Sequence, residues 1–133
     1  MHSSYYPAEV QAMVRSARSS LMRLGVSAKN ISVHPVSGSF EIPLLGSALV
    51  HTKKVDALIG LGIIVAGKTH HAELIARETA RGIMDIQVRG RIPFAFEILY
   101  VDSLALAKSR LEKGKEAAEG VVHSLAELKA LCH

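Results

Sequence analysis

The sequence of 133 residues has no tryptophan, one cysteine, and only three phenylalanines and three tyrosines. A single cysteine, Cys132, excludes an intrachain disulfide and any metal motif built on paired cysteines. Hydrophobic residues nevertheless make up 49% of the chain. The core is therefore expected to be aliphatic, which suits helices packed on a sheet.

Long runs of like charge and long apolar runs are also missing. Basic residues outnumber acidic ones by 16 to 12, a formal charge of +4, yet they are scattered. Nucleic-acid or membrane binding is therefore only weakly indicated, and an anion site on a solvated surface explains the excess better. No apolar stretch approaches the ~18 residues of a membrane span, and residues 1–6 are polar, unlike a signal peptide. We expect a cytoplasmic protein with a single domain over residues 1–133.

What the sequence does contain is an alternation of strand and helix patterns. Patterns typical of strands cover residues 31–36, 57–64 and 94–100. Helical stripes cover residues 7–24, 43–51, 72–88, 103–111 and 117–128, with Lys113 and Gly114 interrupting the last two. This order predicts a layered α/β fold with a parallel sheet. Three strands would make a thin sheet, so residues 1–5 are expected to be the tail of a further strand.

The most informative segment is residues 67–71, Gly-Lys-Thr-His-His, between a buried strand and a helix. Ligands of open α/β sheets bind at such strand ends. Free amides, the positive end of a helix and Lys68 favour an anion there, and histidine can transfer protons near neutral pH. The segment predicts a phosphate-bearing substrate with His71 as the acid–base group. His70 diverges from His71 by ~100° on a helix, which disfavours a two-histidine metal site.

The same segment also fits a nucleotide-binding pattern, and a second segment could hold a ligand. Residues 62–69 satisfy GxxxxGK[ST], although this short pattern occurs by chance and only Asp102 could serve as the later magnesium carboxylate. Residues 37–43, Ser-Gly-Ser-Phe-Glu-Ile-Pro, contain small residues that let a ligand approach the backbone. Glu41 could accept hydrogen bonds from ligand hydroxyls, or simply complement a helix dipole.

In their order, these segments resemble the 6,7-dimethyl-8-ribityllumazine synthase family of riboflavin biosynthesis. The family's P-G-A-F-E-I-P corresponds to residues 37–43, its L-G-x-V-I-R-G-x-T-x-H to residues 61–71, its N-E-A-A-K-G-I to residues 77–83, and its P-V-x-F to residues 93–96. The resemblance implies a three-layer sandwich with a parallel sheet of order 2-1-3-4, flanked by helices on both faces. It also implies condensation of 5-amino-6-ribitylaminouracil with 3,4-dihydroxy-2-butanone 4-phosphate, with release of phosphate and without a metal or organic cofactor.

The resemblance further implies a role for each matching residue. His71 corresponds to the proton-transferring histidine, and Gly67, Lys68, Thr69 and Arg110 to the phosphate-binding positions. The positions that hold the ribitylaminouracil are Tyr5, Ser39, Phe40, Glu41, Ile63, Ile64, Val65 and Phe96. In the family, Phe96 and Arg110 would come from the neighbouring subunit of a pentamer, and pentamers sometimes assemble into shells of 60 subunits.

The chain departs from the family pattern at four places. Most of the first strand, which is central in the family's sheet, is absent, and its loss would leave strand edges unpaired. Tyr5 replaces a phenylalanine, Ala66 replaces an arginine whose charge Lys68 could restore, and the loop after Arg110 is shorter. The missing first strand and the change at Ala66 support an alternative function, that of a non-catalytic or engineered oligomeric shell or scaffold with the same fold.

Overall fold

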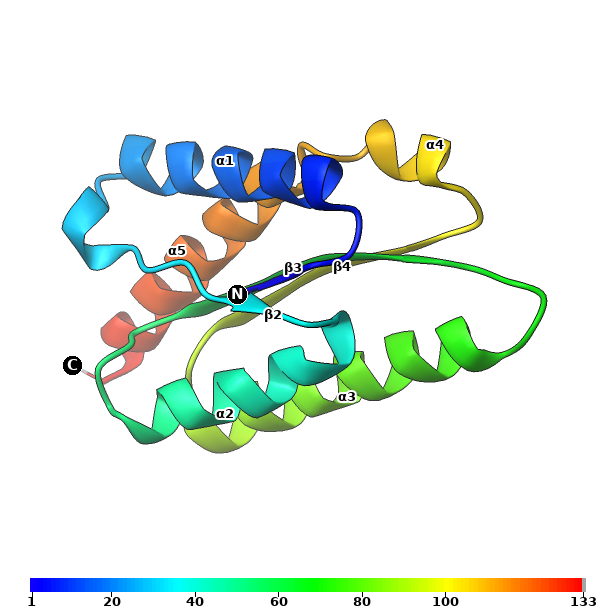
Figure 1. Ribbon diagram of the computed structural model, residues 1–133. Coiled ribbons are helices and arrows are strands. Elements are labelled where there is room, and N and C mark those ends of the chain that lie inside the picture. Colours follow the sequence, from blue (N-terminus) through cyan, green and yellow to red (C-terminus); the bar gives the residue numbers. More distant parts are fainter. Residues whose placement is uncertain (133) are drawn as a thin grey trace.

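The computed structural model describes residues 1–132 and contains a four-stranded parallel sheet in the order β2-β1-β3-β4 (Figure 1). The strands are β1 (His2–Ser3), β2 (Pro35–Val36), β3 (Leu58–Val65) and β4 (Phe94–Val101). The α-helices are α1 (Pro7–Arg23), α2 (Ile42–His51), α3 (His71–Gly90), α4 (Leu104–Lys108) and α5 (Lys113–Leu131), with 3₁₀ turns η1 (Ala28–Asn30) and η2 (Ser39–Glu41). The predicted fold class and strand order are confirmed.

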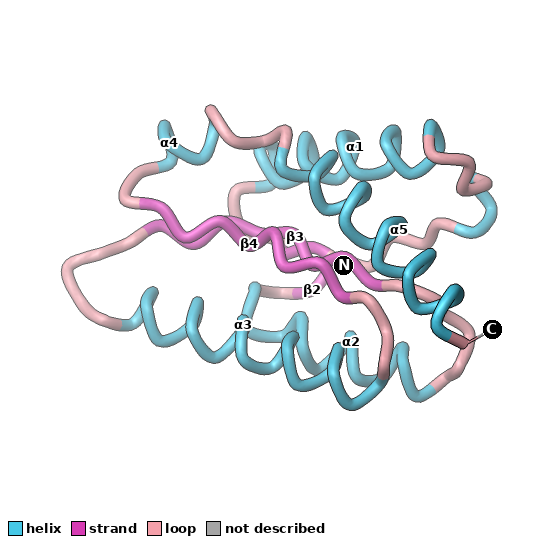
Figure 2. Tube along the Cα trace, turned by 180° about the vertical axis from the view of Figure 1, so that it is seen from behind, coloured by secondary structure: helices cyan, strands magenta, loops and turns pink. Residues whose placement is uncertain are grey.

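Helices cover both faces of the sheet, as Figures 1 and 2 show from opposite sides. α1, α4 and α5 lie on one face, where Val10 and Met13 pack against Leu61 and Ile63 of β3. α2 and α3 lie on the other face, around Ile42 and the other buried residues of that cluster (Leu58, Ile64, Ala76, Ile83, Ile92, Phe94 and Ile98). Phe94 is the one aromatic side chain buried in the described core, so the core is aliphatic, as its composition indicated. None of the helices described between residues 7 and 131 is both long and apolar enough to span a membrane.

β1 is only two residues long, yet it joins the two halves of the sheet. The His2 amide donates to the carbonyl of His34, and the Leu61 amide donates to the carbonyl of Met1, both at 3.0 Å. The amino group of Met1 donates to the carbonyl of Ile59 at 2.8 Å, and burial lowers the pKa of this amine to about 6. Residues 1–5 therefore do contain a short piece of a central strand, as predicted.

β2 is shorter than the strand predicted over residues 31–36. Only Pro35 and Val36 pair with β1, opposite His2 and Ser3. A strand needs a neighbour to satisfy its peptide groups, and β1 begins too late to pair with residues 31–33. Residues 31–33 thus have the alternating pattern of a strand, but no segment of β1 lies beside them to pair with.

The predicted break at Lys113 and Gly114 is wrong, because α5 begins at Lys113. The chain turns over residues 109–112 instead. Gly114 is buried where α5 crosses α1, and a Cβ there would collide with the carbonyl oxygen of Met13. The glycine permits close packing of two helices and does not end one.

Candidate active site

The predicted site residues follow successive strands at the carboxyl edge of the sheet. Tyr5 follows β1, η2 follows β2, and residues 67–71 follow β3 (Figure 1). β1 leads into α1 on one face, whereas β3 leads into α3 on the other, so the connections diverge between these two neighbouring strands. Such a divergence opens the crevice in which α/β proteins bind ligands.

Tyr5 and Glu41 meet at Gly38. The Tyr5 amide donates to Ser3 Oγ at 3.1 Å, and the left-handed backbone of Tyr6 (φ 50°) then turns the chain into α1. A Cβ built on Gly38 would lie 3.4 Å from Tyr5 Cε2 and 3.5 Å from Glu41 Oε2. The exposed Tyr5 ring and the Glu41 carboxylate therefore both lie against Gly38.

Two oxygen atoms in this part of the site are buried without a hydrogen-bond partner in residues 1–132: Ser39 Oγ and Glu41 Oε2. The other Glu41 oxygen, Oε1, accepts from Ser37 Oγ at 3.1 Å, which orients the carboxylate. Buried polar atoms are normally paired in folded proteins. Ser39 and Glu41 are thus available to ligand hydroxyl and amide groups. The Phe40 side chain between them is exposed.

At the end of β3, main-chain groups and not side chains face the candidate site. Ile63 is buried against α1 and Ile64 against α2 and α3. Beyond Ser3, however, β1 no longer lies beside β3. In a parallel sheet, the peptide groups of alternate residues point toward the same neighbouring strand. The Ile63 carbonyl and the Val65 amide therefore point into the space that follows Ser3.

Gly62 decides between two of the sequence hypotheses. It lies inside β3 and is buried, so residues 62–65 cannot form the phosphate loop of a nucleotide-binding motif, and that alternative is excluded. A Cβ on Gly62 would lie 2.5 Å from Ser39 Oγ. The glycine therefore provides the room that Ser39 occupies.

The loop between β3 and α3 carries the candidate anion-binding and proton-transferring groups. Gly67, Lys68 and Thr69 are exposed, and the His71 amide donates to Thr69 Oγ1 at 3.4 Å. The amides of Ala72 and Glu73, in the first turn of α3, have no backbone acceptor within the described chain. His70 Nδ1 lies 3.6 Å from Glu73 Oε2, while the exposed His71 ring makes no side-chain bond to residues 1–132. The loop thus offers free amides, one lysine and an unengaged imidazole.

Phe96 lies away from this group within one chain. Phe96 pairs in register with Gly60, whereas the site lies three to five residues further along β3, roughly 10–17 Å at the usual rise of a strand. Arg110 lies in the turn before α5, where its amide donates to the carbonyl of Ala107 at 2.8 Å.

Sequence reasoning missed the residues that position the site. Ser3 and Ser37 anchor Tyr5 and Glu41 from two and four residues earlier in the chain, and the sequence alone does not indicate this role for a serine. Thr79 on α3 is completely buried, and its Oγ1 has no partner in the described chain; nothing in the sequence distinguishes it from an ordinary core threonine. Across residues 1–132, no three His, Cys, Asp or Glu side chains lie close enough to hold a metal ion.

Comparison with known proteins agrees with the resemblance of the sequence. The sequence model of the family described as 6,7-dimethyl-8-ribityllumazine synthase matches residues 1–129. The 6,7-dimethyl-8-ribityllumazine synthase of Paracidovorax citrulli is 39% identical over 113 residues, which cover 84% of this chain and 73% of that protein. The enzyme of the same name from a Polaromonas species is 38% identical over 112 residues, with the same shares covered. The chain therefore belongs to the 6,7-dimethyl-8-ribityllumazine synthase family.

Proposed function

We propose that the protein is an enzyme of riboflavin biosynthesis, a transferase that condenses 5-amino-6-ribitylaminouracil with 3,4-dihydroxy-2-butanone 4-phosphate. The products would be 6,7-dimethyl-8-ribityllumazine, phosphate and water. Family membership supports this proposal, and one structural observation carries it. The unpaired oxygens of Ser39 and Glu41 lie buried beside Tyr5 at the point where the sheet connections diverge.

The ribitylaminouracil would bind between Tyr5 and the end of β3. Glu41 Oε2 would accept hydrogen bonds from ribityl hydroxyls, because a carboxylate is an acceptor only and this oxygen is otherwise unsatisfied. The pyrimidine ring would contact the exposed rings of Tyr5 and Phe40. Its amide groups would bond to Ser39 and to the main chain of residues 63–65.

The phosphate ester would bind at the start of α3. The amides of this turn, the helix dipole and Lys68 all favour an anion, and Gly67 and Thr69 shape the loop. The amino group of the uracil would form an imine with the ketone and release water. His71 would remove the proton that allows phosphate to leave. It would return a proton as the ribitylamino nitrogen attacks the remaining carbonyl, closes the ring and releases a second water. These condensations and eliminations involve no net oxidation or reduction.

A neighbouring subunit would complete the site. Four of the six aromatic side chains are exposed (Tyr5, Phe40, Phe96 and Tyr100), together with Leu44, Leu74, Met84 and Val88 on α2 and α3. Exposed apolar side chains in such number indicate a surface that other chains cover. We infer self-association to a pentamer or a larger shell, in which Phe96 reaches the Tyr5–Glu41 site of the next subunit and Arg110 reaches its phosphate region at the start of α3.

The first experiment mixes the purified protein with both substrates and follows the absorbance and fluorescence of the lumazine above the uncatalysed background. His71→Ala should lower the rate by ~10²–10⁴-fold, the usual contribution of a general acid–base group. His70→Ala is the matched control, because His70 is directed at Glu73, and it should retain the wild-type rate.

Either of two results would contradict the proposal: no acceleration by the folded, assembled protein, or equal rates for His71→Ala and the wild type. Assembly without turnover would instead favour the second candidate, an oligomeric scaffold of the same fold. The two-residue length of β1 is the observation that keeps this candidate open.

A further inference from the structure

The buried side-chain oxygens that lack a hydrogen-bond partner gather in one part of the molecule. Within residues 1–132 they are Ser39 Oγ, Glu41 Oε2 and Thr79 Oγ1. Ser39 and Glu41 belong to η2, and Thr79 belongs to α3, the helix that packs against η2. Buried polar atoms are normally paired. Ser39 and Glu41 face the proposed ligand, but the hydroxyl of Thr79 has no role so far.

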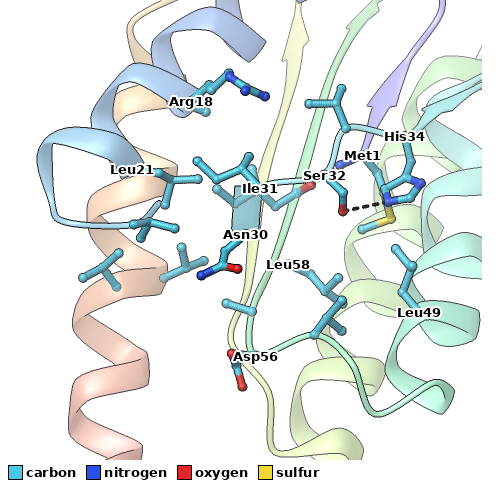
Figure 3. Close-up of a pocket in the computed structure, with 18 of the residues that line it drawn as sticks. Met1, Arg18, Leu21, Asn30, Ile31, Ser32, His34, Leu49, Asp56 and Leu58 are labelled. Carbon is cyan, nitrogen blue, oxygen red and sulfur yellow. Dashed lines mark hydrogen bonds between the residues drawn. The ribbon is translucent and has the colours of Figure 1, made fainter. Parts of the chain in front are cut away.

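The largest cavity of the described chain does not explain these oxygens. Its volume is about 730 Å³, and it lies at the amino edge of the sheet, where Figure 3 shows Leu21 and Leu58 beside it. Ser39, Glu41 and Thr79 are not among the residues that line it. A molecule held in that cavity would therefore not bond to them.

Three contacts fix how α3 sits against α2 and β3. Both helices run in the direction opposite to β3 (Figure 1). A Cβ on Gly82 of α3 would lie 3.0 Å from Pro43 Cβ of α2. A Cβ on Gly60 of β3 would lie 3.1 Å from Ile42 Cγ2 and 3.5 Å from Ile83 Cδ1. Residues 42–43, residues 82–83 and Gly60 therefore lie at one level of the fold.

One level closer to the carboxyl edge, Thr79 meets Ser39. Thr79 precedes Ile83 by about one helical turn, roughly 5.4 Å, and Gly62 follows Gly60 by roughly 6.5 Å along β3. A Cβ on Gly62 would lie 2.5 Å from Ser39 Oγ. Ser39 is 6% exposed and Thr79 is completely buried. Both hydroxyls therefore lie hidden from solvent in the same layer, between α3 and Gly62.

The hydroxyl of Thr79 does not help to hold the described chain together. Threonine within a helix often bonds back to the carbonyl four residues earlier, but Thr79 Oγ1 makes no such bond. Valine has a similar shape without the hydroxyl, and a buried hydroxyl without a partner costs stability. The hydroxyl is therefore explained by a state in which it is bonded, and Ser39 Oγ is the unpaired group beside it.

We propose that Thr79 is a positioning residue for Ser39. When the ribitylaminouracil binds, the Thr79 hydroxyl donates to Ser39 Oγ, directly or through one buried water, and the Ser39 hydroxyl donates to a carbonyl oxygen of the pyrimidine ring. A hydroxyl that accepts one hydrogen bond is a stronger donor of the next. This role rests on the proposed synthase function. It makes Ser39 selective for a ring carbonyl, although Thr79 itself does not touch the ligand.

The test compares ligand affinity with stability. Calorimetric titration gives the dissociation constant of 5-amino-6-ribitylaminouracil, and urea titration gives the free energy of unfolding. Thr79→Val should bind about three- to tenfold more weakly, the effect of one lost hydrogen bond, and should be at least as stable as the wild type. Thr79→Ser keeps the hydroxyl but loses a methyl group, so it should be less stable yet bind within about twofold of the wild type. A purely structural role would move affinity and stability together.

Two further variants serve as controls. Thr52 Oγ1 donates to the carbonyl of Leu49 at 2.6 Å and accepts from the Lys54 amide at 3.2 Å, at the far end of α2 from Ser39. Thr52→Val should therefore lower stability and leave the dissociation constant unchanged. In a Ser39→Ala background, which removes the acceptor, Thr79→Val should cause no further loss of affinity.

Three results would overturn the role of Thr79 and leave the synthase proposal standing: equal affinity of Thr79→Val and the wild type, a loss in Thr79→Ser as large as in Thr79→Val, or an undiminished loss in the Ser39→Ala background. A folded wild type that neither binds the ribitylaminouracil nor forms the lumazine would overturn the synthase proposal, and the role of Thr79 with it. The two failures are distinct, because the first requires a wild type that binds.

Discussion

At the scale of single residues, the site is shaped by one glycine beside one serine. Gly62 Cα faces Ser39 so closely that an added Cβ would lie 2.5 Å from Ser39 Oγ and 3.3 Å from Ser3 Cβ. Ser39 in turn is buried with an unpaired hydroxyl. The identity of a residue inside β3 therefore fixes the position of a proposed ligand-binding group on the neighbouring segment.

Gly62→Ala should lower the free energy of unfolding by ~1–3 kcal/mol, the usual effect of overpacking. It should also abolish most lumazine formation, because Ser39 must move. The double variant Gly62→Ala/Ser39→Ala removes the clashing hydroxyl and should recover part of the lost stability without recovering activity. Urea titrations of the wild type and the three variants measure this cycle. If the losses in free energy of unfolding simply add in the double variant, the side chains at positions 62 and 39 do not clash.

Glu97 on β4 is a second residue with a testable consequence. Burial raises the pKa of its carboxyl above the ordinary value of 4.5, with Lys113 lowering it and Glu116 raising it by smaller amounts. A carboxyl whose pKa is raised in the folded state favours folding when it is protonated. This contribution is complete below the ordinary value and is lost as the pH rises through the folded pKa.

Glu97→Gln should therefore stabilise the protein at neutral pH, and the gain should vanish below the ordinary carboxyl value of 4.5. Chemical denaturation of both proteins across this range measures the difference. Glu119→Gln, an exposed change on α5, should alter stability by less than ~0.5 kcal/mol. A gain for Glu97→Gln that persists unchanged in acid would rule out titration of Glu97 as its cause.

Only part of the candidate site could be predicted from the sequence. His71, Lys68 and Glu41 could be named as candidates because an imidazole, an amine and a carboxylate at strand and helix ends can bind or transfer protons to a ligand. The sequence could not show that Ile63 and Ile64 are buried on opposite faces and offer only main chain. It could not show either that Glu41 Oε2 lacks a partner, because pairing depends on the neighbouring segments of the fold.

At the scale of elements, the helices were predictable because their signals are local. Pro7 begins α1, Gly25 follows it with φ of +96°, and the Ser103 side chain caps α4 by accepting from the Leu106 amide at 3.3 Å. The length of β2 and the start of α5 were not predictable. Each depends on a distant segment, β1 in one case and α1 in the other.

The two glycines of α5 form a matched pair. Gly114→Ala should destabilise the protein by ~1–3 kcal/mol, because its Cβ would strike the main chain of α1. Gly120→Ala, with nothing within 4 Å, should stabilise it by about 0.5–1 kcal/mol through helix propensity. Thermal unfolding of the two variants compares the same substitution in the same helix. Equal shifts would show that α1 and α5 do not approach closely at Gly114.

At the scale of the whole molecule, the proposed site is shared between two subunits. Phe96 lies several residues along the sheet from the end of β3 in one chain, and the proposal takes both Phe96 and Arg110 from the neighbouring subunit. His71→Ala and Arg110→Ala subunits should each be nearly inactive alone. Unfolded together in equal amounts and refolded, they should form mixed assemblies in which roughly a quarter of the interfaces combine the two intact residues. Lumazine formation by the mixture measures this recovery.

The control for this mixing experiment is the same pair of variants combined without unfolding, which should stay inactive if subunits do not exchange. A refolded mixture that remains inactive, while refolded wild type regains its activity, would place both residues in the same chain's site. The experiment thus separates a shared site from a site within one subunit, even before the size of the assembly is known.

The position of β1 has a consequence for how the molecule is made. Its two residues leave the ribosome before their partners on either side, because Pro35 and Leu61 are synthesised much later. β2 has no other strand to pair with, so the sheet cannot close before β3 exists. During synthesis His2 and Ser3 therefore remain without their hydrogen-bond partners until β3 has been made. Such long-range closure slows folding and prolongs exposure to chaperones and to aggregation.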